Sequence, residues 1–531
     1  MDAEMESHGR EFAPELDLTE PPEGSDRRAF MMRSAMAAAI ATLTGRPIAA
    51  FASTPANAPP LTGKLDPSLE VVKQEKGPVM ILADEFYKVG PGPSSSHTIG
   101  PMRITYDFYQ RCTKLPAAQL DQATKLRVNL FGSLSATGQG HGTERAALAG
   151  LVGKEPATID PAFLDGLAAD PSQVFPVRLG NKTINVSLAD IVYDATKGDF
   201  HHANTMTCHL LAGDKSLLEQ EYYSVGGGFI EWKGYNPPTK HAPKFPYSRM
   251  SEVVAYANKN NMSVAQIAMA NEVSISGRSE AEINAFLDKI LGAMRLTVKA
   301  GLEAPTSTLP GPIKLKTKAR DVYTNAQNQP GPARQAIGLV SAFALAGSEE
   351  NARGHLVITA PTGGSAGVMP AVMYSLGEGG AKLPDDKLRN GLLAALVVGY
   401  LCKHHATLAA AEGGCQAEIG VASAMGAAAI AQAYDEPAQV VANAAEGALE
   451  HHLGMTCDPV AGYVQIPCIE RCAFGAVKSW TGYLIAKNEV PMNRRVDFDS
   501  TVDALAITAK EMNSKYKETS EGGLAVSLVL C

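Results

Sequence analysis

The sequence predicts an α+β N-terminal domain followed by an all-α C-terminal domain. From about residue 79 to residue 232, short segments with alternating apolar residues are typical of strands between short helices. The clearest of these segments are Leu126–Leu130, Ile184–Leu188 and Glu219–Ser224. Beyond residue 248, alanine-rich segments such as Ala417–Tyr434 and Ala438–His452 consist of good helix formers. A stretch rich in Pro, Lys and Gly separates the two regions, and it can continue neither type of element.

The chain has 531 residues, which is more than one hydrophobic core usually supports, so more than one domain is expected. We place the first domain at residues 79–235, a linker at 236–247 and the second domain at 248–531. The formal charge of −8 comes from 55 acidic and 47 basic residues without a long basic run, so nucleic acid is not an expected partner. The longest apolar run of the two domains, Gly391–Cys402, is shorter than the roughly 20 residues that cross a bilayer, so no stable membrane span is expected.

Residues 1–58 predict an export leader, joined to the first domain by a linker at residues 59–78. Arg27 and Arg28 precede a small-residue apolar stretch, Ala35–Leu43, and alanine-rich sites that suit cleavage follow, with a cut after Ala52 preferred. The pattern resembles a twin-arginine signal, which implies a periplasmic location. The alternative is an alanine-rich N-terminal helix of a cytoplasmic protein.

The cysteines give the first indication of chemistry. Three of the eight, Cys415, Cys457 and Cys468, stand in polar, turn-forming surroundings. Cysteines at helix starts have depressed thiol pKa values, and the thiolate is the form that binds iron–sulfur clusters. Spacing alone leaves the question open, because there is no Cys-x-x-Cys and an even number of cysteines in an exported chain also suits disulfides.

Several long motifs occur in both predicted domains. In the first domain they are Gly90–Pro101 (GPGPSSSHTIGP) and Gly138–Thr143 (GQGHGT). In the second domain they are Ile358–Pro370, Gly414–Gly420 (GCQAEIG), His452–Val460, Val464–Arg471 (VQIPCIER) and the tail Glu518–Ala525. In kind and in order they resemble the β and α domains of iron–sulfur-dependent L-serine dehydratases. The resemblance runs from about residue 79 to the last residue.

The resemblance implies an L-serine ammonia-lyase, which eliminates water from L-serine to give pyruvate and ammonia, and it implies a homodimer. It makes Cys415, Cys457 and Cys468 ligands of a 4Fe-4S cluster whose fourth iron is available as a Lewis acid for the substrate carboxylate and hydroxyl. It also suggests that Cys531, the last residue, folds back and caps this iron until serine displaces it. The alternative for Cys531 is an incidental cysteine in a frayed tail.

His141 is the favoured general base, because an imidazole titrates near working pH and its flanking glycines let a substrate approach closely. The resemblance points to the same histidine. Taken alone, a histidine between glycines is more often a turn residue, and His97 competes for the role.

Two loops are expected to bind the substrate carboxylate. The first is a cluster of hydroxyl donors around a histidine, which would equally suit a helix N-cap, and it consists of Ser94, Ser95, Ser96, His97 and Thr98. The second offers backbone N–H groups, with a simple glycine-rich turn as the alternative, and it consists of Thr362, Gly363, Gly364 and Ser365.

The resemblance adds Asn204 to the substrate-binding residues, and it also shows departures from the family pattern. Ala203 stands where the family usually has Pro, Gly363 stands where it usually has Asn, and Ala409–Gly414 departs from the usual Ser-Gly-Ala-Glu-x-Gly. L-threonine or L-cysteine therefore stays open as an alternative substrate.

Two other functions fit parts of the sequence. A pyridoxal phosphate dehydratase performs the same overall reaction, and Thr362–Gly367 superficially resembles a phosphate cup, but no lysine stands in a recognisable Schiff-base site. The second alternative is a non-catalytic iron–sulfur sensor that binds serine, which an assay for pyruvate distinguishes from an enzyme.

Overall fold

The computed structural model describes residues 77–196, 198, 200–236 and 239–528. The predicted leader, residues 1–58, and the predicted capping residue, Cys531, lie outside these residues. Export of the protein therefore stays a prediction, and so does formation of a homodimer.

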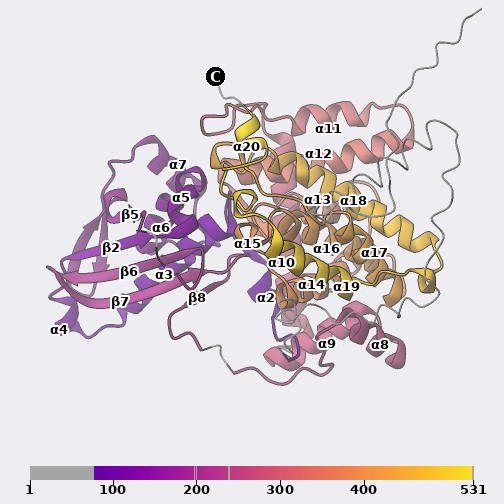
Figure 1. Ribbon diagram of the computed structural model, residues 1–531, viewed down its shortest axis with the longest axis horizontal. Helices are drawn as coiled ribbons and strands as arrows, with labels where there is room; N and C mark the ends of the chain where they lie inside the picture. Colours follow the sequence, from indigo (N-terminus) through magenta and orange to yellow (C-terminus); the bar gives the residue numbers. More distant parts are fainter. Residues whose placement is uncertain (1–76, 197, 199, 237–238, 529–531) are drawn as a thin grey trace, which may run out of the picture. The chain divides into compact units, whose positions relative to one another are not determined.

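The N-terminal half is built on a five-stranded sheet with the strand order β5-β2-β6-β7-β8 (Figure 1). β2 pairs in parallel with β5 and antiparallel with β6, and the remaining pairs are antiparallel. The strands are β2 (Lys125–Leu130), β5 (Ile191–Tyr193), β6 (Thr205–Ala212), β7 (Lys215–Ser224) and β8 (Ile230–Trp232). In β2, Leu126, Val128 and Leu130 are buried while the residues between them are more exposed, as the alternating pattern predicts.

A separate antiparallel hairpin, β3 (Phe175–Leu179) and β4 (Lys182–Val186), contains the third predicted strand segment. That strand ends two residues earlier than predicted, because Leu188 begins a short 3-10 turn.

Helices pack on the sheet and complete its hydrophobic core. Phe108 and Leu148, from two neighbouring helices, join Val128 and Met206 of the sheet in one buried cluster. The helices of this half are α3 (Gly100–Thr113), α4 (Ala117–Leu120), α5 (Gly132–His141), α6 (Thr143–Leu151) and α7 (Pro161–Ala169).

The first described residues belong to the core of the helical half. α2 (Ala83–Phe86) buries Ala83 and Phe86 in that core, and β1 (Lys88–Pro91) pairs antiparallel with β9 (Leu356–Thr359). This strand pair joins the two halves of the sequence. It also brings together the two loops that follow the strands, residues 94–98 and residues 362–365, which are the two predicted substrate loops.

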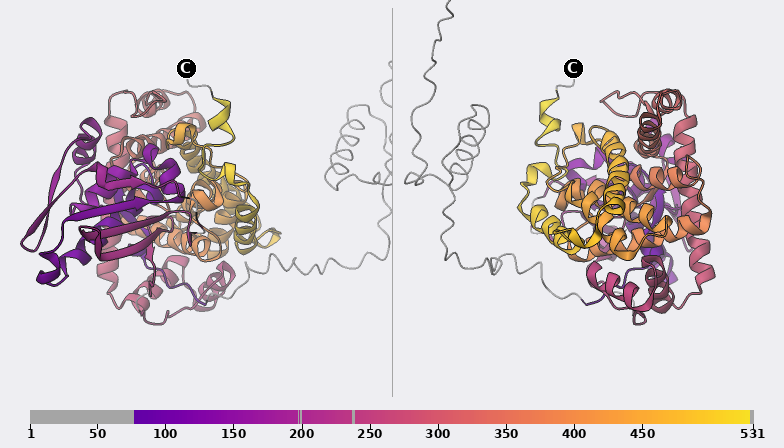
Figure 2. Two further views of the ribbon diagram at one scale, coloured as in Figure 1. Left: turned by 60° about the vertical axis from the view of Figure 1, so that its left-hand side comes forward. Right: turned by 90° about the vertical axis from the view of Figure 1, so that its right-hand side faces the viewer.

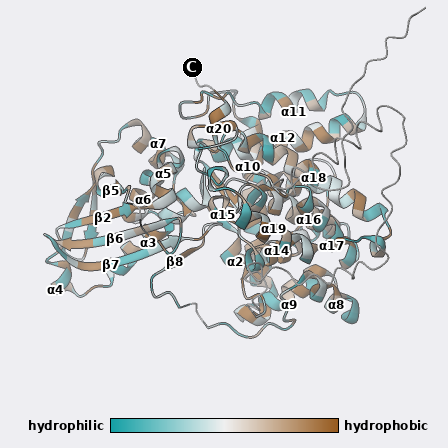
Figure 3. Cartoon of the chain, in the orientation of Figure 1, coloured by the Kyte–Doolittle hydropathy of each residue, from teal (hydrophilic) through white to brown (hydrophobic). Residues whose placement is uncertain are grey.

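The helical half is arranged around α16 (Val421–Ala433), in which every residue is buried. α16 packs against four other helices, and Figure 1 shows them gathered around it. Figure 2 shows the helical half from two further sides. Small residues allow close contact, since a Cβ added to Gly391 would lie 2.9 Å from the backbone oxygen of Ala429. Hydrophilic residues are frequent on the peripheral helices α8 and α11 (Figure 3).

The remaining helices of this half are α8 (Met250–Asn260), α9 (Val264–Ser276), α10 (Glu280–Glu303), α11 (Ala319–Gln327), α12 (Pro332–Arg353), α13 (Val368–Leu376), α14 (Asp385–His405), α15 (Ala410–Gly413), α17 (Ala438–Glu450), α18 (Cys468–Asn488), α19 (Phe498–Glu511) and α20 (Leu524–Ser527). The predicted order of an α+β half and a helical half is confirmed. The prediction of an all-α second domain did not include the short strand β9. Within the described residues, none of the helices combines the length and the apolar character that crossing a membrane requires.

Candidate active site

Three cysteines from three different elements meet in the interior of the helical half. Cys415 precedes the short π-helix η4 (Gln416–Gly420), Cys457 follows α17, and Cys468 is the first residue of α18. All three are buried. The Cys415 and Cys457 sulfurs and a carboxylate oxygen of Glu418 lie within 4.8 Å of one another, and Cys468 hydrogen-bonds to Cys415. The structure therefore brings together the three cysteines singled out in the sequence, and it adds Glu418.

The three thiols of this cysteine cluster do not have the same tendency to ionise. Hydrogen bonds from Cys457 and Cys468 hold the pKa of the Cys415 thiol well below its usual value, and Arg471, whose Nη1 lies 3.3 Å from the sulfur, lowers it further. The nearby Cys415 thiolate and burial in turn raise the pKa values of Cys457 and Cys468. Three thiolates at such close range therefore require a cation between them.

A fourth cysteine, Cys472, lies one turn further along α18. Its sulfur donates a hydrogen bond to the backbone oxygen of Gly364 at 3.3 Å, and burial raises its pKa to about 12. Cys472 therefore behaves as a neutral packing residue beside the cluster.

His141 is the last residue of α5, and its side chain is fully buried. Its Nδ1 donates a hydrogen bond to the backbone oxygen of Thr137 at 2.9 Å, one helical turn earlier. This bond fixes the tautomer in which Nε2 carries the lone pair. Nε2 faces the Glu518 carboxylate at 3.5 Å, too far for a strong hydrogen bond, so it is available as a proton acceptor.

His97 lies beside His141, with the two ring centres 4.6 Å apart. Both nitrogens of His97 are already hydrogen-bonded, to Ser96 Oγ at 2.9 Å and to Ser133 Oγ at 3.0 Å. Burial lowers the pKa of His97 to about 4 and so keeps the ring neutral. Of the two histidines, His141 is the better placed to accept a proton.

The serine-rich loop folds into the short π-helix η2 (Ser95–Ile99), which the N-cap alternative in part anticipated. Ser94 Oγ accepts a hydrogen bond from the backbone N–H of His97 at 3.1 Å. Thr98 donates to the backbone oxygen of His141 at 2.9 Å, so this loop also supports the helix end that carries the histidine. The loop, including Ser95 and Ser96, is buried.

The second glycine-rich loop lies between the serine-rich loop and Glu418. A Cβ added to Gly363 would come within 2.7 Å of the backbone nitrogen of Ser95, and one added to Gly364 would come within 2.6 Å of the Glu418 carboxylate. The hydroxyls of Thr362 and Ser365 hydrogen-bond to each other at 3.0 Å. In this chain, Gly363 therefore fits closely against the backbone of the serine-rich loop, and Gly364 fits against the Glu418 carboxylate.

Asn204 precedes β6 and is fully buried. Its Nδ2 donates to the backbone oxygen of Ser224 at 3.1 Å, and Ser224 Oγ donates to the backbone oxygen of Ser96 at 2.7 Å. Oδ1 of Asn204 has no hydrogen-bond partner among the described residues. Asn204 is thus connected to the serine-rich loop through Ser224, and it keeps one acceptor unused.

A segment near the C-terminus reaches the same place. The backbone of Cys457 donates to Tyr516 O at 2.7 Å and accepts from Glu518 N at 2.9 Å. Glu518 has a φ of +59°, which residues with side chains rarely adopt, and this conformation accompanies the burial of its carboxylate near His141. Glu418, Arg471 and Glu518 are residues of this site that sequence reasoning did not single out.

The fold and the site together define an enzyme with a candidate soft-metal site inside its helical part, next to a histidine and a loop of its α+β part. Two family models match, the serine dehydratase beta chain over residues 83–235 and the serine dehydratase alpha chain over residues 259–525. The chain is 36% identical to an L-serine dehydratase of Haemophilus influenzae over 464 residues, which covers 85% of this chain and 100% of the relative.

Two further relatives show the same level of identity. L-serine dehydratase 1 of Escherichia coli is 36% identical over 457 residues, with 85% of this chain and 99% of the relative covered. An L-serine dehydratase of Streptomyces coelicolor is 36% identical over 455 residues, with 84% of this chain and 99% of the relative covered. The chain belongs to the serine dehydratase family.

Proposed function

We propose that the protein is an L-serine ammonia-lyase that converts L-serine to pyruvate and ammonia. The observation that carries the proposal is the meeting of Cys415, Cys457 and Cys468 with His141 and the two predicted substrate loops in one buried site. The relatives named L-serine dehydratase, which align over nearly their whole length, support the choice of substrate.

We infer that the three cysteines hold a 4Fe-4S cluster. The donors fit, because soft thiolates are the ligands of iron–sulfur clusters and this set cannot ionise together without a cation. When bound, the cluster would supply a Lewis acid for the serine carboxylate and hydroxyl. Arg471 supports the arrangement, since it contacts both the Cys415 sulfur and, at 2.6 Å, the backbone oxygen of Thr456 beside Cys457.

The protein's own residues supply the proton transfer and the orientation of the substrate. His141 Nε2 takes the proton from the α-carbon, the β-hydroxyl leaves as hydroxide, and return of the proton from His141 converts the hydroxide to water, which gives aminoacrylate as the other product. This product tautomerises to an imine, and a water molecule hydrolyses the imine to pyruvate and ammonia. The serine-rich loop and the Thr362–Ser365 loop orient the carboxylate, and Asn204 Oδ1 is an acceptor suited to the substrate ammonium group.

The direct test is the formation of pyruvate from L-serine by protein purified without oxygen, together with its visible absorption spectrum. We expect pyruvate, ammonia and the broad absorbance of an iron–sulfur cluster. L-threonine and L-cysteine, assayed in parallel, test the alternative substrates. If the protein carries iron and binds serine but releases no pyruvate, the sensor is correct and the enzyme proposal is wrong.

One contact indicates where a difference in substrate preference could arise. His202 Nε2 lies 3.2 Å from the Glu412 carboxylate, and each residue belongs to a segment that departs from the family pattern. The two departures are therefore neighbours, and a difference in substrate preference would be expected to involve both.

We expect Gly363→Ala to reduce pyruvate formation by roughly 10²-fold, because its Cβ forces the two substrate loops apart and misplaces the substrate. Bound iron should stay normal, since Gly363 contacts none of the cysteines. Gly292→Ala is the matched control, because a Cβ added there meets no atom within 4 Å. In helix α10 that change should stabilise the protein slightly, by up to about 1 kcal/mol, and leave activity normal. Equal activities of the two variants would contradict this role for the glycine loop.

Cys531 is proposed as a displaceable fourth ligand. Cys531→Ser should retain the iron held by Cys415, Cys457 and Cys468 but lose the labile iron faster in air. Serine should also change the cluster spectrum of the wild-type protein more than that of the variant. Equal lifetimes in oxygen and equal spectral changes on addition of serine would remove Cys531 from the ligand set.

A further inference from the structure

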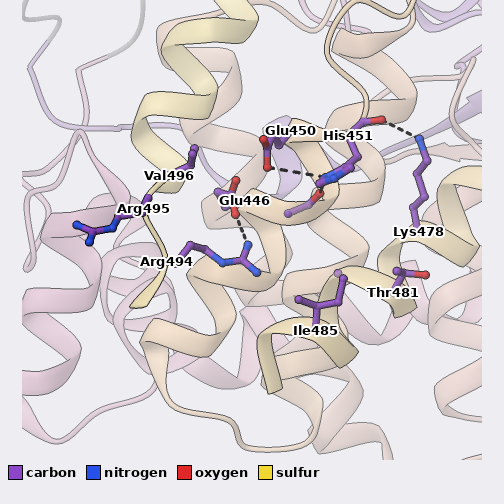
Figure 4. Close-up of a pocket in the computed structure, with 11 residues that line it drawn as sticks. Glu446, Glu450, His451, Lys478, Thr481, Ile485, Arg494, Arg495 and Val496 are labelled. Carbon is purple, nitrogen blue, oxygen red and sulfur yellow. Dashed lines mark hydrogen bonds and ion pairs between the residues drawn. The ribbon is translucent and has the colours of Figure 1, made fainter. Parts of the chain in front are cut away.

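A second pocket, separate from the candidate active site, opens between α17, α18 and the segment that leads into α19 (Figure 4). Its volume is about 400 Å³. None of its lining residues belongs to the active site described above, so it has no part in the proposed reaction.

The inner wall of this pocket holds a buried carboxylate with an unused acceptor. The side chain of Glu446, on α17, is only 1% exposed. Its Oε2 is paired with Arg494, while its Oε1 is buried and has no hydrogen-bond partner among the described residues. A buried acceptor without a partner is costly, and a donor entering the pocket would satisfy it.

The charges around Glu446 do not balance. Glu450 stands one helical turn later on α17, and its carboxylate lies close enough to that of Glu446 for the two to hydrogen-bond when one of them is protonated and to repel each other when both are charged. The only cation that pairs with Glu446 among the described residues is Arg494, which is shared with Glu489 at 2.9 Å and with the backbone oxygen of Asn443 at 2.8 Å. Two carboxylates thus share one guanidinium, and a third, that of Glu450, lies beside Glu446.

The other basic residues that line the pocket contribute little at Glu446. His451 Nδ1 lies 3.8 Å from a carboxylate oxygen of Glu450 but donates its hydrogen bond to the backbone oxygen of Gly447 at 2.8 Å. Lys478 donates to the backbone oxygen of His451 at 2.8 Å, and Arg495 points away from Glu446 (Figure 4). Burial raises the pKa of Glu446 to about 7, with Arg494 opposing the rise and Glu450 adding to it. A further positive charge between Glu446 and Glu450 would therefore be stabilised.

The shape of the pocket indicates what kind of cation fits. A bare metal ion would leave most of this pocket empty, because the volume is much larger than an ion needs. Ile485 and Val496 supply an apolar wall. Gly447 keeps the inner end open for Arg494, since an added Cβ would lie 3.0 Å from Nη1 of that residue.

We propose that this pocket binds a primary ammonium compound with a short apolar body. The ammonium group donates hydrogen bonds to Glu446 Oε1 and to the Glu450 carboxylate, and the carbon chain lies against Ile485 and Val496.

The test is isothermal titration calorimetry of the full chain with n-butylammonium chloride. We expect saturable binding of one ion per chain, while n-butyrate and n-butanol, which match its size but lack the charge, should give no saturable heat. Glu446→Gln should abolish binding, and Glu450→Gln should weaken it by at least about tenfold, as expected for loss of a charged hydrogen-bond partner. Glu489→Gln is the matched control, because Glu489 contacts Arg494 without lining the pocket, and it should leave binding in place.

Three outcomes would overturn the proposal: no saturable binding of n-butylammonium by the wild-type protein, unchanged affinity in Glu450→Gln, or binding of n-butyrate instead. If circular dichroism shows that Glu446→Gln does not fold, Glu450→Gln decides, since the Glu450 side chain is 44% exposed and does not contribute to the core.

Discussion

Replacement of Cys415, Cys457 or Cys468 by alanine is expected to abolish both bound iron and pyruvate formation. The three sulfurs come from separate elements and meet in the interior, so the loss of any one leaves a cluster with two protein ligands in a buried site. Iron and acid-labile sulfide, the visible spectrum and pyruvate should all be measured after reconstitution without oxygen.

Cys402→Ala is the matched control for these variants. Cys402 is equally buried, lies in α14, and has a pKa raised by burial, which marks it as a neutral packing thiol. Its replacement should cost stability on the order of 1 kcal/mol while iron and activity stay normal. Full iron content and full activity in any one of the three ligand variants would contradict the assignment of that cysteine.

His141→Asn is expected to leave the cluster spectrum nearly unchanged while it lowers kcat by about two to four orders of magnitude, the usual cost of losing a general base. Exchange of the serine α-proton with deuterated solvent should disappear as well. The exchange measurement separates loss of the base from loss of folding, because the same sample can be shown to hold iron.

His209→Asn, on β6, serves as the histidine control. His209 pairs with Glu219 on the neighbouring strand and touches none of the site residues, so both turnover and exchange should persist. A near-normal rate in His141→Asn would mean that another group acts as the general base, and His97 and Glu518 are the nearest candidates.

The sequence identified the parts of the site that have local signals. The three cysteines stand at turns and helix starts, and the serine-rich and glycine-rich loops have compositions that only loops of this kind tolerate. The order of strands and helices was likewise visible in hydrophobic periodicity. Each of these features depends on residues close together in the chain.

The contributions of Glu418 and Glu518 could not be predicted in the same way. The two carboxylates are 100 positions apart, and that of Glu518 reaches the site because the segment around Tyr516 pairs with the backbone of Cys457. A glutamate in a polar tail is normally solvent-exposed, so its burial depends on tertiary contacts that leave no local pattern. The strand β9 was missed for a related reason, since three apolar residues followed by a threonine fit a buried helix as well as a strand.

The sequence favoured His141 over His97 because of its flanking glycines, but it could not show how the nitrogens of the two rings are used. What separates them is the use of their nitrogens. Both nitrogens of His97 are hydrogen-bonded to serine hydroxyls. In His141, Nδ1 is hydrogen-bonded to the backbone of its own helix, and Nε2 has no such partner among the described residues.

The pairing of β1 with β9 bears on how the protein could be divided. If the chain were cut within residues 236–247, β1, Phe86 and Tyr87 of the N-terminal piece would lose the residues they pack against. The C-terminal piece would have a gap in its core at the place that these residues fill. Neither piece should be soluble and well ordered alone, yet the two expressed together should reassociate through that strand pair. The protein is thus suited to fragment complementation, in which recovered activity reports that the two pieces have met.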